Sequence, residues 1–486
     1  MGGLRFVRSA CAVIAVIAAF GVAGCVNLAP VPVRPDAPVA AQWPGAVTGV
    51  AGSPAAADID WRSFVTDARL RDVIERALRN NRDLRVAVLN IERARAQYRV
   101  ERSVLLPAIG VGAGAARQRT PATTSASGNA STGTQYSVAL GLAAYELDFF
   151  GRVRNLSEAA LQSFFAVEEN RRSSQISLVA EVASLWLTLA ADTDRLQLAR
   201  DTLKSQQASY ELTRRTRELG GASGLTLAQA QTTVDSARVD AARFASLVAQ
   251  DRNALEFLVG APLADALLPV PTPPDAAPAP ASLLVDVPAG LPAEVLQRRP
   301  DVLAAERLLH AANADIGVAR AALFPRITLT ASAGTQSRSL GDLFRNGSGA
   351  WSFAPQIDLP IFDAGRRRAD VQLTEAQQAI AVANYEKTLQ VAFREIADAL
   401  VERGTLGEQL AAQQSLTDAT RTAYRLSDAL FKNGASSYLG VLDAQRAMYA
   451  AMQNSITLRL TEQGNRVALY RALGGGWSVG PAGEGL

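Results

Sequence analysis

The chain has 486 residues, of which 48% are hydrophobic and 20% charged, and its formal net charge is +3 at pH 7. The basic residues are spread along the chain rather than clustered, so no nucleic-acid partner is expected. Both cysteines, Cys11 and Cys25, lie at the very start. The rest of the chain can therefore hold no disulfide, cysteine nucleophile or cysteine metal site. His310 is the single histidine, in a helical context, and zinc or histidine acid–base chemistry normally needs more.

The first residues have the pattern of an export signal. Arg5 and Arg8 precede an apolar run from Ala10 to Ala23 that is too short to span a bilayer, so residues 1–24 are predicted to be a signal peptide. The run ends in Val-Ala-Gly-Cys, which resembles a bacterial lipobox and makes Cys25 the predicted lipidation site, carrying acyl chains such as palmitate. An ordinary signal peptide with an incidental cysteine is the alternative.

The segment after the lipobox is predicted to be a tether. Residues 25–60 are rich in proline, alanine and glycine, which favours an extended, lipid-anchored segment without a core. Residue 26 is valine. In lipoproteins of this type an aspartate there usually means retention in the inner membrane, so the valine indicates the outer membrane.

The remainder of the chain is one unit used twice. Gly221-Ala222-Ser223 and Gly434-Ala435-Ser436 are similar turns 213 residues apart, and each opens a helical pattern that ends at a Leu-Val-Gly or Ala-Leu-Gly stop. We predict a first structural repeat over residues 61–261, a proline-rich linker over 262–290, a second repeat over 291–476 and a flexible tail over 477–486.

Each repeat contains two segments in which apolar residues alternate with glycine, alanine or serine. This period of two predicts a β-hairpin, and strands of this kind are typical of a membrane barrel. A soluble two-sided hairpin is the alternative, and the independent second occurrence weakens it. The four segments are 109–115, 136–143, 327–333 and 351–359.

Long helices surround these hairpins. A helix is predicted from about Asp67 to Leu105, ended by Pro107. A very long helix is predicted after Gly151 and ends at about Leu219. At about 1.5 Å per residue its length would be roughly 100 Å. Its heptad seam indicates a coiled-coil element that Asp192 and Gln206 interrupt. The return helix is predicted over 225–258. In the second repeat, one long helix is predicted to end at about residue 431, and its return helix is predicted from about 438 to 473.

Four strands cannot close a barrel, and a membrane-spanning sheet with open edges leaves unpaired backbone groups in hydrocarbon. The chain is therefore expected to associate through its strands, as two copies with eight strands or three copies with twelve.

Together these features resemble the TolC/OprM-like outer-membrane efflux protein family, in its lipoprotein branch. The resemblance covers residues 60–476 and rests also on Leu-Phe-Pro-Arg-Ile before the third strand and Pro-Ile-Phe-Asp-Ala-Gly-Arg after the fourth. It implies a mainly α fold with a membrane β-barrel. Duplicated long helical hairpins would form a periplasmic α-barrel, and a homotrimer would close a twelve-stranded barrel.

The resemblance also implies the function. Members of the family are passive exit ducts in the outer membrane that pass small molecules, including drugs, from an inner-membrane pump and a periplasmic adaptor to the outside. The pump is often of the resistance–nodulation–division class. We therefore expect no enzyme, no cofactor and no metal site.

Gate and contact residues follow from the same resemblance. Asp443 matches an inward aspartate that closes the periplasmic end in the family, and Phe431 stands where the family has a tyrosine. A second aspartate of the family is replaced by Gly440. A solvated helix residue is the alternative for Asp443. The expected adaptor-contacting tips are Gly221, Ala222, Ser223, Gly434, Ala435, Ser436 and Tyr438.

Two other classes of protein remain as alternatives. A structural or adhesive coiled-coil lipoprotein of the envelope explains the lipobox and the heptads but not the paired alternating strands. An envelope hydrolase would need a catalytic centre, and the sole histidine lies in a Leu-Leu-His-Ala-Ala helix.

Overall fold

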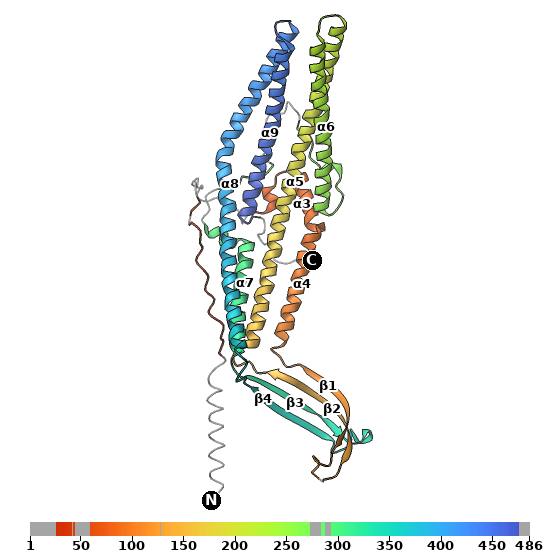
Figure 1. Cartoon of the computed structure of the whole chain (residues 1–486), viewed down its shortest axis with the longest axis vertical. Coiled ribbons are helices and arrows are strands. Elements are labelled where there is room, and N and C mark those ends of the chain that lie inside the picture. The colour runs from red at the N-terminus through yellow and green to blue at the C-terminus, as the bar shows by residue number, and fades with distance from the viewer. Residues whose placement is uncertain are drawn as a thin grey trace. The chain divides into compact units, whose positions relative to one another are not determined.

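The structure is a computed structural model of the whole chain (Figure 1), and it describes residues 26–40, 42–43, 59–126, 128–272, 283–286 and 293–475. The predicted signal peptide, Cys25 and the predicted tail over 477–486 lie outside the described residues.

The described chain folds into two compact units, and each takes segments from both repeats. The first is built mainly from residues 91–167 and 304–385, and the second mainly from 168–272 and 386–475. The long helices pass from one unit into the other, so the units do not coincide with the repeats. The domain boundaries drawn from the sequence stay predictions.

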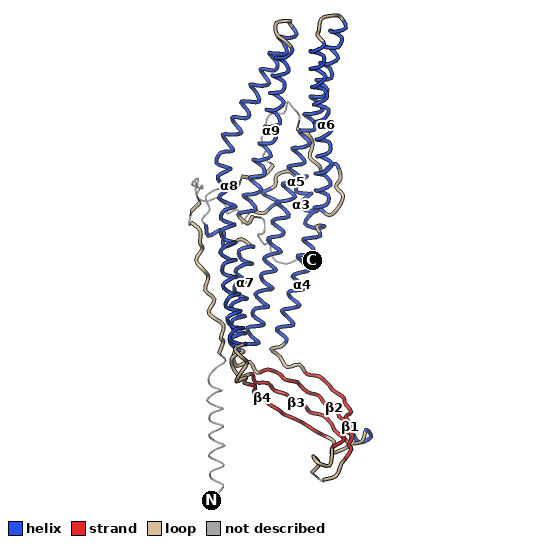
Figure 2. The backbone as a smooth tube through the Cα atoms, in the orientation of Figure 1, coloured by secondary structure: helices blue, strands red, loops and turns tan. Residues whose placement is uncertain are grey.

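The first unit contains one antiparallel sheet with strand order β1-β2-β3-β4. All four predicted strands are present, and most run further than predicted because pairing continues toward the loops (Figure 2). They are β1 (Ile109–Thr120), β2 (Ser131–Glu146), β3 (Arg326–Ser337) and β4 (Gly349–Asp358). A bulge lies between Leu142 and Tyr145 of β2, where Ala144 has a positive φ of 50°.

The first helix is broken, which the apolar periodicity did not indicate. It consists of α3 (Ala68–Asn80), capped by Asp67, and α4 (Arg82–Ser103). Asn81 makes the break, because its side-chain oxygen accepts a hydrogen bond from the Leu84 N–H at 2.8 Å and thus begins a new helix. Its side-chain nitrogen donates to the Leu258 carbonyl at 2.8 Å, which ties the break to the end of the return helix.

The long helices are present as predicted. They are α5 (Arg152–Glu218), α6 (Gly224–Val259), α8 (Arg366–Lys432) and α9 (Tyr438–Ala472). A shorter helix, α7 (Pro300–Ala321), follows the linker. α5 contains a stretch long and apolar enough to cross a bilayer, yet 61% of that stretch is buried inside the described chain. We interpret this stretch as a packing core for the other helices.

Part of the predicted linker is ordered by pairing in the second unit. Leu284 forms a β-bridge with Val65, directly after the short helix α2 (Trp61–Phe64), and is fully buried. Phe64 stacks on Tyr470 with ring centroids 3.9 Å apart. Apolar burial of this kind ties the end of α9 to the first residues after the tether.

Candidate functional site

One face of the sheet is apolar across all four strands. The register aligns one row through Val111, Leu140, Ala333 and Trp351, and the next through Ile109, Leu142, Ala331 and Phe353. The larger side chains of these rows are exposed: Val111 by 73%, Trp351 by 80% and Phe353 by 62%. An apolar face that meets no other part of its own described unit suits contact with hydrocarbon.

In the middle of the strands, the opposite face carries small or neutral polar side chains. Its rows run through Gly110, Gly141, Ser332 and Ser352, and through Gly112, Ala139, Gly334 and Ala350. The Ser332 and Ser352 hydroxyls lie 2.8 Å apart and share a hydrogen bond. Gly334 leaves no room for a side chain, because an added Cβ would lie 2.1 Å from the Val138 carbonyl oxygen. This face suits water rather than lipid.

The sheet has two unpaired edges within the described chain. β1 pairs only with β2, and β4 pairs only with β3. Backbone N–H and C=O groups on the outer sides of β1 and β4 therefore have no partner strand of their own chain. Inside a bilayer each such group costs several kcal/mol, so the edges need strands from further copies.

A buried carboxylate at the end of β2 forms ion pairs with arginines of two other elements. Glu146, at the end of β2, receives hydrogen bonds from Nε and Nη2 of Arg152, both at 2.7 Å, and its carboxylate lies 2.7 Å from Nε of Arg326. Its side chain is 8% exposed. One residue thus connects β2, the start of α5 and the start of β3. The pairing with Arg326 could not be predicted from local patterns, because Arg326 lies 180 residues after Glu146 in the chain, whereas Arg152 is only six residues away.

The tips of the two long hairpins are narrow turns. Gly220 and Gly434 have φ values of 84° and 72°, which only glycine adopts readily. Ser223 caps α6 by accepting a hydrogen bond from the Thr226 N–H at 3.1 Å. Among the predicted contact residues, Gly221, Ser223, Gly434 and Ala435 are exposed, whereas Ala222 and Ser436 are half-buried.

Tyr438 is buried rather than presented at the surface. It forms a cluster with Ala230, Val441 and Leu442, against which Tyr210, Tyr424 and Phe431 pack. The cluster joins side chains of α5, α6, α8 and α9, so it holds both hairpins together close to their tips. Tyr438 therefore supports the tip from inside and offers a partner little of its side chain.

The two predicted gate residues lie in different surroundings. The ring of Phe431 lies 5.3 Å from that of Tyr438, inside the tip cluster. Asp443 is exposed on α9. Within the part of the chain that the structure describes, no hydrogen bond or ion pair joins the two. An exposed carboxylate close to the tip is available to face a lumen, and its role as a gate stays a prediction.

The two interruptions of the heptad seam are buried and have partners. Gln206 accepts a hydrogen bond from the Thr233 hydroxyl of α6 at 2.8 Å. Asp192 is 5% exposed and lies 2.5 Å from Nη1 of Arg195, whose Nη2 donates to the Thr457 hydroxyl of α9 at 2.9 Å. On α6, Asp251 lies next to Asp192. Burial and the negative charge of Asp192 raise the pKa of Asp251 to about 6, and Arg195 opposes this rise.

The pKa of Asp251 predicts how stability depends on pH. The ordinary pKa of this carboxyl group is 3.8, so between about pH 4 and pH 6 the folded chain binds more protons than the unfolded chain. The stability of the folded protein therefore falls as the pH rises through this interval. Replacing Asp251 with Asn is expected to stabilise the protein at pH 7.5 by about 1 kcal/mol, after allowance for solvent screening. It should also flatten the pH dependence in that interval.

Thermal unfolding of detergent-solubilised protein between pH 4.5 and 8 measures both effects. Asp235→Asn, on the same helix and exposed, is the matched control and is expected to leave the pH profile unchanged. A wild-type melting temperature that rises between pH 5 and 7 would contradict the assignment.

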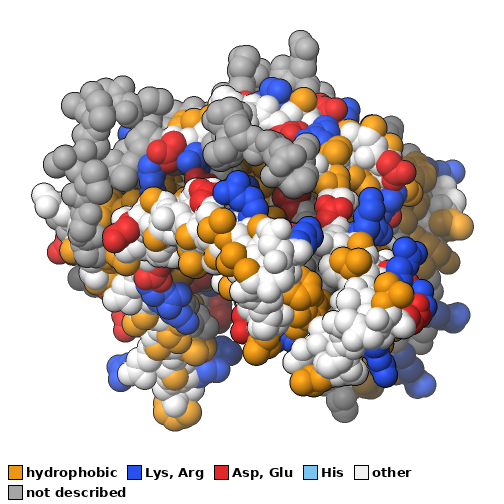
Figure 3. Space-filling view, turned by 90° about the horizontal axis from the view of Figure 1, so that it is seen from above, with side chains coloured by type: hydrophobic (Ala, Val, Ile, Leu, Met, Phe, Trp, Pro, Cys, Tyr) orange, Lys and Arg blue, Asp and Glu red, His pale blue; other side chains and the backbone are white. Residues whose placement is uncertain are grey.

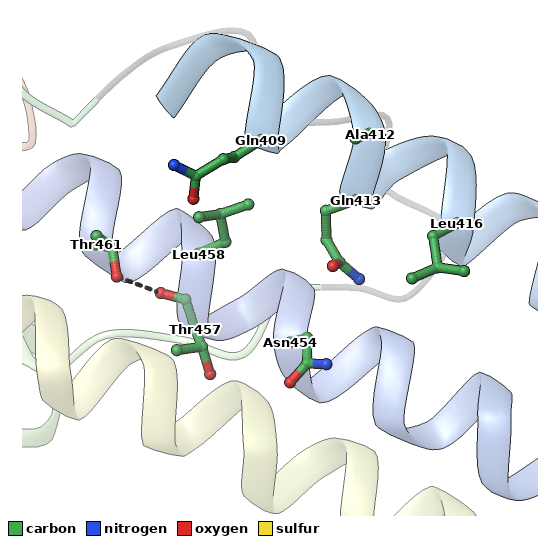
Figure 4. A pocket seen from close by; sticks show the side chains of 8 residues that line it. All are labelled: Gln409, Ala412, Gln413, Leu416, Asn454, Thr457, Leu458 and Thr461. Carbon is green, nitrogen blue, oxygen red and sulfur yellow. Dashed lines mark hydrogen bonds between the residues drawn. The ribbon is translucent and has the colours of Figure 1, made fainter. Parts of the chain in front are cut away.

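A groove lies between α8 and α9 in the second unit (Figure 4). Its volume is about 460 Å³, and the residues that line it are Gln409, Ala412, Gln413, Leu416, Asn454, Thr457, Leu458 and Thr461. The Thr461 hydroxyl donates to the Thr457 carbonyl at 3.1 Å, and Gln413 donates to the Ala451 carbonyl at 2.9 Å. The lining consists of neutral polar and apolar side chains and contains no titratable group.

The remaining titratable groups are dispersed. His310 lies on α7 with its Nε2 4.0 Å from Oε1 of Glu306. Among the described residues no group of three or more His, Cys, Asp or Glu side chains is placed to hold a metal ion. Basic and acidic side chains are interspersed over the face seen in Figure 3, without a single basic patch. An antiparallel sheet with two open edges and exposed apolar side chains, in a chain that also forms two pairs of long helices, is typical of a channel-forming membrane protein.

Comparison with known proteins identifies the family. The model of the outer membrane efflux protein family matches residues 73–261 and 291–475. The probable efflux pump outer membrane protein TtgC of Pseudomonas putida is 48% identical over 468 residues, which cover 95% of this chain and 94% of the relative. The outer membrane protein OprJ of Pseudomonas aeruginosa is 44% identical over 457 residues, covering 94% of each.

A solved structure agrees with these relatives. The MtrE outer membrane channel of Neisseria gonorrhoeae, in its open state, superposes with a TM-score of 0.81 at 38% identity, covering 93% of this chain and 98% of that one. The chain belongs to the outer membrane efflux protein family. It is an outer-membrane exit channel of a tripartite efflux system, as the sequence predicted.

Proposed function

We propose that three copies of this chain close one twelve-stranded barrel, and that the barrel is the outer-membrane end of a continuous export duct. The observation that carries the proposal is the pair of open edges, β1 and β4, on a sheet that carries a band of exposed apolar side chains across one face. Pairing of β1 of one copy with β4 of the next would satisfy every edge in a closed ring.

Three copies fit better than two because of the inner face. An eight-stranded barrel has an interior just wide enough for side chains to fill. Here the inner face carries mainly glycine, alanine and serine, which would leave such an interior unfilled. Twelve strands with the same small side chains enclose a wider, water-filled lumen that a small solute can pass.

The position of the chain's start supports a lipid anchor on Cys25. The Val26 N–H donates to the Phe149 carbonyl at 3.1 Å, and Phe149 lies in the turn between β2 and α5. An acyl chain on the preceding residue would therefore enter the bilayer where the sheet ends. Several acyl chains on one residue give a stable anchor.

Substrate delivery belongs to partner proteins in this proposal. The helical tips would meet a periplasmic adaptor through Gly221, Ser223, Gly434 and Ala435, and the adaptor would connect them to an inner-membrane pump of the resistance–nodulation–division class. The relative TtgC is described as a probable efflux pump outer membrane protein, which supports a duct rather than an enzyme. The duct would conduct passively.

The first test is the native mass of protein extracted in mild detergent from separated outer membranes. We expect about three chain masses, because only a closed ring satisfies the strand edges in a bilayer. Protein from the inner-membrane fraction, analysed in the same way, is the control for incomplete assembly. A mass of one chain in the outer-membrane fraction would leave the edges unpaired and would exclude the barrel.

Asp443→Ala tests the gate. If three Asp443 side chains line the narrow end of the duct, their removal takes away a ring of negative charge that favours cations. We expect a higher resting conductance and a lower preference for potassium over chloride in planar bilayers. Asp418→Ala, an exposed position on α8 paired with Arg421, is the matched control. Unchanged conductance and selectivity would remove Asp443 from the gate.

A further inference from the structure

The two repeats carry the same short sequence where the sheet ends and a long helix begins. It reads Gly-Arg-x-Arg, at residues 151–154 before and within α5 and at 365–368 before and within α8. Gly151 and Gly365 have similar left-handed φ values of 79° and 85°. Because the two turns share this backbone feature, their side-chain neighbours can be compared position by position at an offset of 214 residues.

In the first repeat both arginines are neutralised by the chain itself. Glu146 receives two hydrogen bonds from Arg152 at 2.7 Å. Asp148 lies 3.3 Å from Nε of Arg154 and also accepts from the Arg154 backbone N–H at 2.9 Å. The first turn therefore has no need of an external anion.

In the second repeat the two carboxylates are missing. The residues at the positions of Glu146 and Asp148 are Pro360 and Phe362, which offer no side-chain acceptor. In the described structure the guanidinium groups of Arg366 and Arg368 make no ion pair, and both residues are exposed.

The nearby carboxylates do not compensate for the second pair of arginines. Asp363 pairs with Arg367 at 3.6 Å and caps the turn by accepting from the Gly365 N–H at 3.1 Å. Asp370, one turn further along α8, forms no ion pair with Arg366 in the described structure. Two cations at the positive end of a 67-residue helix are electrostatically unfavourable without an anion.

Large apolar side chains are exposed beside these cations. Ile361 is 88% exposed and Phe362 is 89% exposed. They follow directly on the apolar face of β4, where Trp351, Phe353 and Ile357 are exposed. The apolar face of the sheet thus continues to the turn and ends beside two guanidinium groups without an ion-pair partner. This arrangement is complementary to a phospholipid, which has apolar acyl chains and a charged phosphate.

We propose that the turn between β4 and α8 binds an anionic phospholipid of the periplasmic leaflet. Arg366 and Arg368 contact the phosphate, and Ile361 and Phe362 lie among the acyl chains. Arginine suits this role because its planar group forms paired hydrogen bonds with phosphate oxygens. The inference requires only the outer-membrane location of the chain and is independent of how many copies close the barrel.

Native mass spectrometry of the delipidated full-length protein, titrated with dioleoyl phosphatidylglycerol in detergent, tests the site. The double variant Arg366→Gln/Arg368→Gln is expected to bind this lipid about thirty-fold more weakly than the wild type, since two surface arginines are removed. Arg154→Gln is the matched control from the first repeat and is expected to bind as the wild type does. Dioleoyl phosphatidylcholine should bind the wild type and the double variant equally.

A second variant transfers the first repeat's arrangement to the second. Phe362→Asp places a carboxylate where Asp148 stands, so it should pair with Arg368 and lower phosphatidylglycerol affinity toward that of the double variant. Phe362→Asn controls for the lost ring and should retain more affinity. Unchanged lipid affinity in the double variant overturns the proposal. If that unchanged affinity comes with a loss of subunit association, the anion that the arginines bind is a carboxylate of a neighbouring copy.

Discussion

Replacing Glu146 with alanine is expected to lower the stability of the folded protein by about 3 kcal/mol, because it breaks a buried ion pair by removing one partner. The Glu146 side chain is only 8% exposed, and Arg152, which is 29% exposed, would lose its carboxylate. The ion pair that connects the end of β2 to the start of α5 would then be lost. The predicted loss is a large fraction of the stability of a typical domain.

Thermal unfolding of the detergent-solubilised variant measures this effect. Asp148→Ala is the comparison at the same turn, and a smaller loss is expected because its partner Arg154 is 42% exposed, whereas Arg152 is 29% exposed. The double variant Glu146→Ala/Arg152→Ala should recover part of the loss, since it removes the stranded cation as well. Equal melting temperatures for the Glu146 and Asp148 variants would show that the Glu146–Arg152 pair contributes no more to stability than the Asp148–Arg154 pair.

Placing an arginine on the apolar face of the sheet is expected to block insertion into the outer membrane. In Phe353→Arg the new charge would face hydrocarbon, at a cost of about 2–4 kcal/mol per chain near the middle of the bilayer. Ser352→Arg, one residue away on the opposite face, should insert normally because that side chain would meet water. Both variants place an arginine in the same strand, so a difference between them reports which face the side chain is on.

Two readouts separate the arginine variants. The amount of heat-stable protein in the outer-membrane fraction should fall for Phe353→Arg and remain for Ser352→Arg. The ion selectivity of single Ser352→Arg channels should shift toward anions, because the added positive charge would line the lumen. Normal insertion of Phe353→Arg together with failed insertion of Ser352→Arg would mean that the two faces of the sheet have been assigned the wrong way round. Equal insertion of both variants would contradict contact of either face with hydrocarbon.

The sequence predicted the helices and strands well because each carries a repeated local pattern. Alternation of Ile109, Val111 and Ala113 with glycines is enough to assign one strand and its apolar face. Duplication then supplied an independent second copy of each element. The buried seam of α5 was likewise visible, including its two polar interruptions at Asp192 and Gln206.

Features that depend on distant partners were not predicted. The break at Asn81 exists because that side chain binds the Leu258 carbonyl, 177 residues later in the chain. The burial of Tyr438 arises from a cluster with Ala230 of the other hairpin. Arg326 reaches Glu146 only after both hairpins have joined one sheet. No local periodicity reports such contacts, so only the folded chain reveals them.

The small neutral side chains of the inner sheet face have a consequence for transport kinetics. If Gly112, Ala139 and Ser332 line the lumen, a solute that passes these rows meets no charged or aromatic side chain to which it could bind. Flux through this section would then rise in proportion to concentration without saturating, and two cargoes present together would not compete. Any saturation or competition measured in cells would have its origin upstream, where cargo is first captured.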